Sequence, residues 1–423
     1  PKGEQQIMAV LRGWLRLPLW QRVLGGLLLG CAMGLIWPQA TPAIAFIGEL
    51  FVRLIRMLVV PIVFIAITSG VTGLADPRRL GAVGGRTLVL FAATTACAVA
   101  IGMAAGLAVQ PGAGAMLGTG QGYALGEPVP LYDQLMGIVP INIIDALVRG
   151  DMLAIIFFSL VFGCSVVLAG EEGRPVANLL QSLARVFFRM VELIMELTPY
   201  GVFSLIAVAV AQNGVAVFVN VGLLALCVVI GVAAQIVLVH LPLLAFVARQ
   251  GIGRFWRAAL DALLVAFATA SSAATLPVAL RVAIDRLGVD RGVASTVLPI
   301  GASIGKDGTA MYVGLLSVFS LQALGITPDV PMLLIIFLTG ALAAFGTAPI
   351  PSASLFMLAA VLAAVGVSTA QTALVIALVL PFDRLLDMTR TIASAHANLT
   401  VTACVARLSA DGVSGPSEAE RPA

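Results

Sequence analysis

Four long apolar runs open the chain, separated by short polar segments. They are Leu19–Trp37, Ile44–Gly73, a run from about Arg86 to Val109, and Asn142–Ala169, which is broken at residues 149–151. About 20 apolar residues are enough for an α-helix to cross a bilayer. The pattern therefore predicts four membrane-spanning units, the fourth of them interrupted.

Two further runs, Val191–Ala211 and Ala216–Val247, follow a basic segment, Glu171–Arg189, that we expect to be a loop. Composition supports a membrane protein, because 60% of the 423 residues are hydrophobic and 11% are charged, whereas soluble domains carry about 25% charged residues. The formal net charge of +3 does not argue for a nucleic-acid partner. The five cysteines have no metal-ligand spacing, so no metal or cofactor is expected. The fold class predicted is an all-α polytopic membrane protein.

Arginine-rich and arginine-free segments alternate along the chain. Arginines gather before Leu19 and in residues 76–86, 174–189, 249–257 and 281–291, whereas residues 38–43, 110–130, 212–215, 323–332 and 365–372 contain no Lys or Arg. Positively charged loops stay in the cytoplasm. We therefore expect a multi-pass protein of the cytoplasmic membrane with cytoplasmic N and C termini. The basic, amphipathic residues 1–16 do not have the pattern of a cleavable signal.

The last third of the chain contains two apolar segments that are each broken in the middle. Leu260–Leu280 is interrupted at residues 269–277 and has arginines at both ends, so it should enter the membrane and turn back. Leu333–Val365, broken at residues 346–354, does the same from the other side. Paired broken segments inserted from opposite sides are typical of inverted-repeat transporters with a site near the bilayer midplane.

A span with a polar interruption follows each of these hairpins, and the first interruption is residues 305–309. Here Lys306 and Asp307 stand between Gly305 and Gly308, and Lys306 is one of only two lysines in the chain. A charge in the bilayer centre costs about 2.5–3.5 kcal/mol, which favours a functional reading. Adjacent residues do not face each other on a regular helix, which argues against a self-neutralising pair. We expect an unwound segment that faces a ligand.

The second interruption, residues 383–398, carries a polar stripe on one helix face. Asp383, Asp387, Arg390, Ser394 and Asn398 follow one another at spacings of three or four within the predicted helix 381–407. An arginine fork matches a carboxylate, and an aspartate one turn earlier can hold an ammonium group. The stripe predicts a pocket for an acidic zwitterion. The alternative is a row of salt bridges that joins two helices.

Several motifs occur in a family-specific order: Val139–Asn142 through Phe158, Pro199–Phe203, Ser271–Pro277, Asp307–Thr309 and Asp387–Thr391. They resemble the dicarboxylate/amino acid:cation symporter family, which includes the excitatory amino acid transporters and archaeal aspartate transporters. The resemblance covers nearly the whole chain. It implies an elevator-type homotrimer whose protomer has eight transmembrane helices and two re-entrant helical hairpins.

The resemblance also implies a division of labour along the chain. Residues 1–85 and 111–215 would form the scaffold, and residues 86–110 and 216–410 the moving transport domain, followed by a disordered cytoplasmic tail, 411–423. By position, Arg390 resembles the residue that binds a substrate side-chain carboxylate, and Asp387 the one that binds its amino group. Having both argues for aspartate or glutamate. Further substrate contacts implied are Ser271, Ser272, Thr309, Thr347, Ile350, Thr391 and Ser394.

Five positions depart from the family pattern in the region where relatives bind sodium. Gly305 and Lys306 replace an asparagine and a methionine, Asn398 replaces an aspartate, Phe91 replaces a tyrosine, and Ser394 replaces an asparagine that contacts both substrate and ion region. Thr94, Thr95 and Asp307 remain, and with Lys306 and Asn398 they form the expected coupling region. We therefore expect transport without sodium, with the Lys306 ammonium as a built-in replacement for a cation. Proton coupling is left open, and His396 receives little weight.

Three other functions are weighed against this one. One is a proton- or sodium-coupled C4-dicarboxylate symporter, and another is a substrate-gated anion channel or a sensor that kept the pocket. An intramembrane hydrolase using Ser271 or Ser272 is disfavoured, because no His or second carboxylate stands as a recognisable partner. We expect a transporter and not an enzyme.

Overall fold

A computed structural model describes residues 19–73, 81–115, 136–137, 139–214, 217–345 and 353–413. These residues form helices and no strand, which confirms the predicted all-α class. The N-terminal basic segment, the turn after residue 73, residues 116–135, the tip of the second hairpin (346–352) and residues 414–423 lie outside the described part.

The first helices match the first four predicted runs: α2 (Leu19–Ile36), α3 (Thr41–Gly73), α4 (Gly81–Val109) and the broken pair α6 (Ile143–Arg149) and α7 (Met152–Leu168). The break in the fourth run has a local cause. Gly150 ends α6 in the left-handed region at φ +72, and the Asp151 side chain accepts a hydrogen bond from the N–H of Ala154 at the start of α7.

The predicted basic loop at residues 171–189 is wrong, because most of it is helical. α8 spans Arg174–Met195 and meets α9 (Thr198–Asn213) at a bend of 51°. α8 is amphipathic: Leu180, Ala184 and Val191 are buried, and its arginines are exposed on the opposite side of the helix. The charged residues of the exposed helix face made this segment resemble a polar loop in the sequence.

The sixth predicted run, residues 216–247, is one long helix that changes its winding. α10 (Val217–Gln235) continues into two π-helical segments, η3 (Ile236–His240) and η4 (Leu243–Val247). The first predicted hairpin follows as α11 (Ile252–Thr269) and α12 (Ser272–Arg281), with a π turn, η5 (Val282–Arg286), at its end. The break is narrower than predicted: only Ala270, at φ +51, and Ser271 separate the two helices.

The helices α13 (Arg291–Ile304) and α14 (Asp307–Ala323) are separated only at Gly305 and Lys306. The prediction of an unwound segment as far as Thr309 is therefore wrong. Asp307, Gly308 and Thr309 form the first turn of α14, where a carboxylate interacts favourably with the positive end of the helix.

The second hairpin consists of α15 (Val330–Phe345) and α16 (Ala353–Ala364), and the last helix, α17, spans Thr369–Val413 without a break. The polar residues at 383–398 lie within this unbroken helix, as the stripe on one helix face requires, and its charged residues bond to one another along the helix. The helix begins before residue 381 and continues to Val413, a little beyond the start expected for the tail at residue 411.

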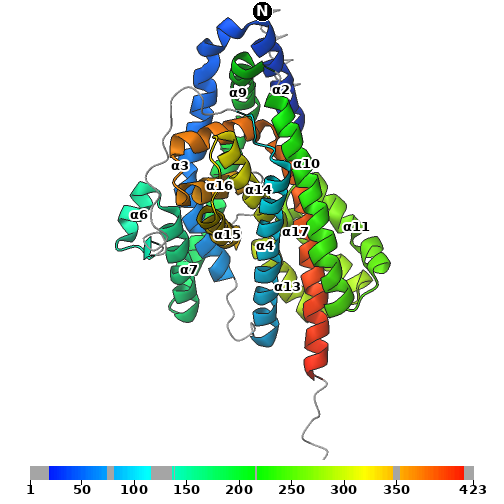
Figure 1. The fold of residues 1–423 in the computed structure, drawn as a ribbon. Helices are drawn as coiled ribbons and strands as arrows, with labels where there is room; N and C mark the ends of the chain where they lie inside the picture. The colour runs from blue at the N-terminus through cyan, green and yellow to red at the C-terminus, as the bar shows by residue number, and fades with distance from the viewer. Residues whose placement is uncertain are drawn as a thin grey trace, which may run out of the picture.

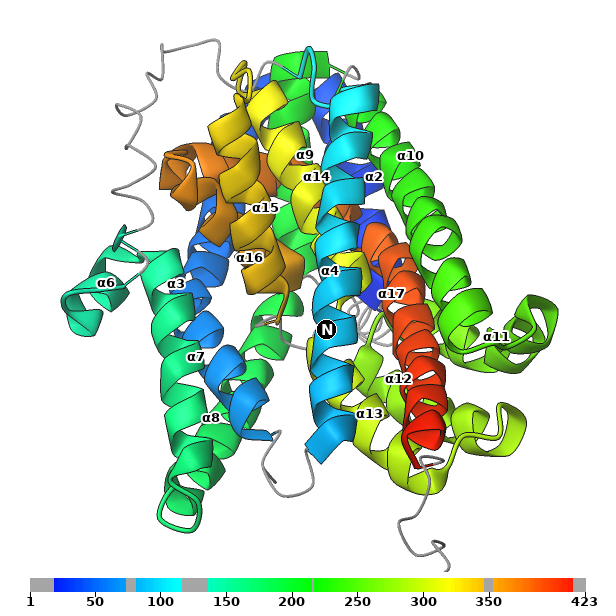
Figure 2. The ribbon, with the colours of Figure 1, turned by 60° about the horizontal axis from the view of Figure 1, so that its bottom comes forward.

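α14 lies at the centre of the molecule, and almost all of its residues are buried. It packs against α4, α10, α16 and α17. Figures 1 and 2 show α3 and α7 on one side of this centre and α10 and α11 on the other. The centre is where the charged residues of α14 and α17 meet, so the fold buries the polar motifs that the sequence singled out.

Two continuous helices of the described part, Val83–Val109 and Phe218–Val247, are long and apolar enough to cross a membrane, and two bent helix pairs raise the number to four. Eight transmembrane helices stay a prediction.

Candidate functional site

Arg390 lies at the centre of the polar stripe of α17. Its Nη1 donates to Asp383 Oδ1 and its Nε to Asp387 Oδ1, both at 3.0 Å, and its side chain is 1% exposed. The ring of Tyr312, from α14, lies under the guanidinium with its centroid 4.1 Å from Cζ. These ion pairs are formed within α17, so the alternative of a salt-bridge row between two helices does not describe them. Asp383, which received no role from the sequence, holds one arm of the arginine.

The first turn of α14 is pressed onto α17 at the same place. The N–H of Gly308 donates to Ser394 Oγ at 3.1 Å. A Cβ at position 308 would collide with the carbonyl group of Arg390. Glycine is required here for the close approach of two backbones. This close contact between α14 and α17 brings the Asp307–Thr309 and Asp387–Thr391 motifs together.

Lys306 is the residue that precedes α14, and its side chain is 3% exposed. The carboxylate that attracts its ammonium is Asp387. Among the described residues, Lys306 forms no ion pair within 4.0 Å, in keeping with the argument against a self-neutralising pair with Asp307. Lys306 and Arg390 are therefore attracted by the same carboxylate, that of Asp387.

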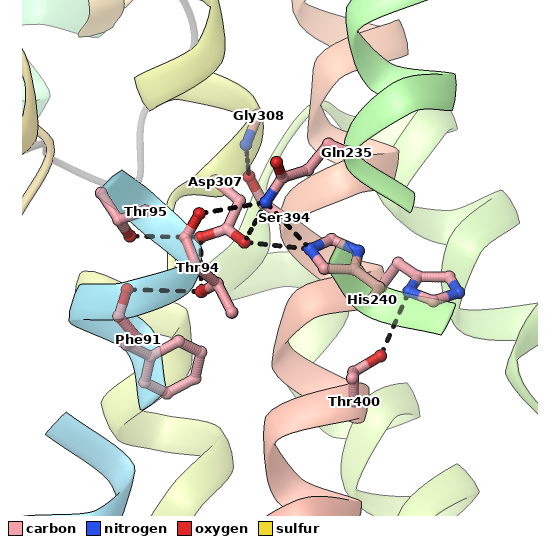
Figure 3. Close-up of polar contacts among 10 residues, drawn as sticks. Phe91, Thr94, Thr95, Gln235, His240, Asp307, Gly308, Ser394 and Thr400 are labelled. Atoms are coloured by element: carbon pink, nitrogen blue, oxygen red, sulfur yellow. Dashed lines mark hydrogen bonds and ion pairs between the residues drawn. The ribbon is translucent and has the colours of Figure 1, made fainter. Parts of the chain in front are cut away.

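The carboxylate of Asp307 is fully buried and accepts hydrogen bonds from four side chains (Figure 3). Thr94 and Thr95 of α4 donate to Oδ1, each at 3.1 Å. Gln235 Nε2 and His240 Nε2 lie 3.0 Å from Oδ2. The expected grouping of Asp307 with Thr94 and Thr95 is therefore present, but two residues that sequence reasoning missed complete it.

The π-helical turn explains how Gln235 and His240 reach one oxygen. A π-helix closes its hydrogen bonds between residues five apart, so residues at that separation lie nearly above one another. Gln235 and His240 have this separation, and their side-chain nitrogens are 3.3 Å apart. The available signal was a histidine within an apolar run, which by default marks function.

Asn398 bonds to two carbonyl groups at the break, one of which, that of Gly301, also accepts a hydrogen bond from the N–H of Gly305. With its amide nitrogen turned toward them, it donates to Gly301 O and Gly305 O, each at 3.2 Å. Side-chain atoms of Asn398 and the buried Phe91 fill the space beside both glycines. The position that relatives were expected to use for a cation is thus occupied by an amide donor and an aromatic ring.

The other predicted contacts divide into three groups. Thr391 Oγ1 donates to Asp387 O at 2.7 Å, and Thr309 lies in the first turn of α14 beside Gly308. Ser271 caps α12, while Ser272 and Asn398 line a cavity of about 10 Å³ between the first hairpin, α13 and α17, enough for about one water molecule. Thr347 and Ile350 lie outside the described residues.

Comparisons with known proteins agree with the motifs. A family model described as the sodium:dicarboxylate symporter family matches residues 19–408. The proton/sodium-glutamate symport protein of Bacillus subtilis (strain 168) is 30% identical over 407 residues, which are 93% of this chain and 93% of that protein. The protein of the same name from Bacillus caldotenax is 34% identical over 387 residues, 88% and 90% of the two chains.

C4-dicarboxylate transport protein 2 of Pseudomonas aeruginosa (strain UCBPP-PA14) is 31% identical over 400 residues, covering 92% of this chain and 90% of that protein. The family match extends over nearly the whole described part of the chain and includes every helix of the site. The chain therefore belongs to the sodium:dicarboxylate symporter family and is a multi-pass membrane transporter, not an enzyme.

Proposed function

We propose that this protein is a secondary active transporter of aspartate or glutamate that works without sodium. The observation that carries the proposal is the buried pair of Arg390 and Asp387 on one face of α17. An acidic amino acid offers a carboxylate for the guanidinium and an ammonium for the aspartate. On binding, it would exchange the Arg390–Asp387 contact for these two, while Asp383 keeps Arg390 in place.

Three features support independence from sodium. The four donors around Asp307 use the lone pairs that a hard cation would need. Asn398 donates to the carbonyl oxygens of Gly301 and Gly305, and the first of these also accepts a hydrogen bond from the N–H of Gly305, so fewer lone pairs are left for a cation. Lys306 brings a fixed positive charge into the break itself. We infer that the lysine attracts the anionic substrate and replaces a coupling cation.

The transport cycle that we propose is of the elevator type. Residues 86–110 and 216–410 would move as one domain against a scaffold of residues 1–85 and 111–215, in a homotrimer in the cytoplasmic membrane. The alternation of arginine-rich and arginine-free segments supports cytoplasmic N and C termini. Family membership is the main support for the moving domain and the trimer.

A second candidate, uptake of C4-dicarboxylates, is favoured by the surroundings of Asp387. This carboxylate is bonded to Arg390 and attracted by Lys306, so two cations already compete for it with a substrate ammonium. A C4-dicarboxylate needs no ammonium partner. The relative from Pseudomonas aeruginosa carries such a name. Competition between L-aspartate and succinate for the purified protein distinguishes the two: aspartate should bind more tightly if the first proposal holds.

The central experiment titrates the purified protein with L-aspartate in sodium and in choline, followed by uptake into sealed vesicles. Equal affinity in both salts together with accumulation or exchange is the expected result. Affinity that rises steeply with sodium would contradict independence from sodium. Binding without any substrate movement in vesicles would favour the channel or sensor instead.

A further inference from the structure

The only two histidines of the chain lie against each other in the buried core. His240 of η3 and His396 of α17 stack with ring centroids 5.0 Å apart and an angle of 12° between the rings, and both are fully buried. Phe255 and Trp256 of α11 pack on the His396 ring at 5.2 and 5.1 Å. The pair is far apart in sequence and shares one apolar enclosure beside Asp307.

The hydrogen bonds define the tautomer of His240. The Asp307 carboxylate only accepts, so His240 carries a hydrogen on Nε2, and the neutral ring has its lone pair on Nδ1. That Nδ1 is buried without a hydrogen-bond partner in the described part of the chain. His396 Nδ1 bonds with Thr400 Oγ1 at 3.2 Å, and its Nε2 has no partner there either. The core therefore holds a basic nitrogen, His240 Nδ1, that accepts no hydrogen bond from any described residue.

The buried charges around this nitrogen do not balance. Among the described buried residues of α14, α17 and the break before α14, Lys306 and Arg390 are cations, and Asp307, Asp383 and Asp387 are carboxylates. Arg390 pairs with Asp383 and Asp387, and Lys306 is attracted by Asp387, while Asp307 has only uncharged donors when the imidazoles are neutral. One negative charge is left over, and an anionic substrate would add to it. Such an excess is costly away from water.

We propose that His240 is the binding site of a coupling proton, an inference that rests on the proposed sodium-independent transport. A proton from water adds to the lone pair of Nδ1, and the imidazolium then pairs with Asp307 and removes the excess charge. Release from Nδ1 on the other side of the membrane restores the neutral ring. His396 is the positioning residue: stacked imidazoles this close do not both carry a charge, so the pair takes up a single proton.

The groups that face His240 from each packed element are few. Asp307 comes from α14 and His396 from α17. α4 and α10 contribute Thr94 and Gln235, which do not titrate. Cys404 of α17 contacts the neighbouring segment η4 through the carbonyl of Leu243. Proton uptake in this cluster is therefore expected to involve the imidazole beside Asp307.

The test measures proton uptake when the full-length protein binds L-aspartate in choline medium. Calorimetry in two buffers with different enthalpies of ionisation gives the number of protons taken up. The wild type should take up about one proton per aspartate, and its affinity should rise by up to about tenfold for each unit of pH decrease. His240→Gln keeps an amide donor for Asp307 without a titrating group, so its uptake should fall to near zero. His396→Phe keeps a ring in the stack and should retain most of the uptake.

The outcomes separate this inference from the proposed function. Aspartate binding in choline without proton uptake by the wild type would overturn the proton site and leave sodium-independent transport standing. Full proton uptake by His240→Gln would overturn it as well. A wild type that binds aspartate only with sodium would refute the proposed function itself. His240→Asn, with an amide one carbon shorter, is the second variant, and the wild-type measurement does not depend on how either variant folds.

Discussion

The side-chain amide of Asn398 donates to the carbonyl oxygen of Gly305 at a distance of 3.2 Å. The bond joins the middle of α17 to the break between α13 and α14. It places a hydrogen-bond donor where an anionic oxygen would favour a cation. Exchanging this one side chain should therefore change the response of the protein to salt.

Asn398→Asp should make the stability of the protein depend on sodium. The new carboxylate would face the carbonyl oxygens of Gly301 and Gly305 instead of donating to them. In choline this repulsion should lower Tm by several degrees, since about 1 kcal/mol moves Tm by about 2–4 °C in a chain of 150–250 residues. Sodium should restore part of the loss. Equal thermal unfolding curves of the variant in the two salts would contradict the interpretation of Asn398.

Lys306→Met should weaken binding of L-aspartate in choline by about 10- to 100-fold, because a buried positive charge near the anionic substrate is lost. Lys306→Arg keeps the charge and is the matched control, with a smaller expected loss. The measurement is a titration of the purified protein. An unchanged affinity in Lys306→Met would show that the lysine only balances Asp387.

Arg390→Lys should weaken the binding of acidic substrates by about 100-fold or more, because an ammonium cannot reproduce the fork that stays on Asp383 while it exchanges Asp387 for the substrate carboxylate. Asp383→Asn keeps the shape of the side chain that holds Arg390 but removes its charge, so the affinity for L-aspartate should fall by about tenfold. Binding of L-aspartate measures both. Equal losses in the two variants would contradict separate binding and positioning roles.

Asp387→Asn should weaken L-aspartate binding more than succinate binding, because only aspartate has an ammonium for this carboxylate. The ratio of the two dissociation constants is the readout, and the matching change of the same helix is Asp383→Asn, which should leave that ratio close to the wild-type value. A ratio that does not change in Asp387→Asn would favour the C4-dicarboxylate candidate.

Gly308→Ala should destabilise the protein by about 1–3 kcal/mol, the usual cost of overpacking. Its Cβ would meet the carbonyl of Arg390, and both backbones are fixed in buried helices. Gly222→Ala, in α10, is the control, because no atom outside its own helix turn lies within 4 Å of the added carbon. Thermal unfolding in detergent compares the two. Equal Tm values would show that α14 can move away from α17.

Local signals in the sequence predicted much of this architecture. Gly150, Ala270–Ser271 and Gly305–Lys306 interrupt apolar runs, and each interruption is a real helix break. The stripe with Asp387 and Arg390 was found from its spacing alone. α8 was missed because its arginines lie on one face of a helix, which a count of charges does not distinguish from a loop.

The network around Asp307 was harder to predict, because it depends on tertiary contacts. Thr95 and Asp307 are 212 positions apart, and His240 lies at the same Asp307 oxygen as Gln235 because the helix winds as a π turn from residue 236 to residue 240. No periodicity of 3.6 places Gln235 and His240 on one side. Similarly, no carboxylate partner for Lys306 followed from the sequence, whereas the carboxylate that attracts it is Asp387, which is far away in the chain.

The contact of Gly308 with α17 has a mechanical consequence. Asp307 holds the network that contains His240, and Gly308, the next residue, touches the backbone of Arg390 and the hydroxyl of Ser394. A single peptide unit, which is planar and resists twisting, therefore connects the two halves of the site. A tilt of that unit would move both halves at once. A change of charge at Asp307 and substrate binding at Arg390 would then both act on the one planar peptide unit between Asp307 and Gly308. No longer chain of contacts would be needed to couple them.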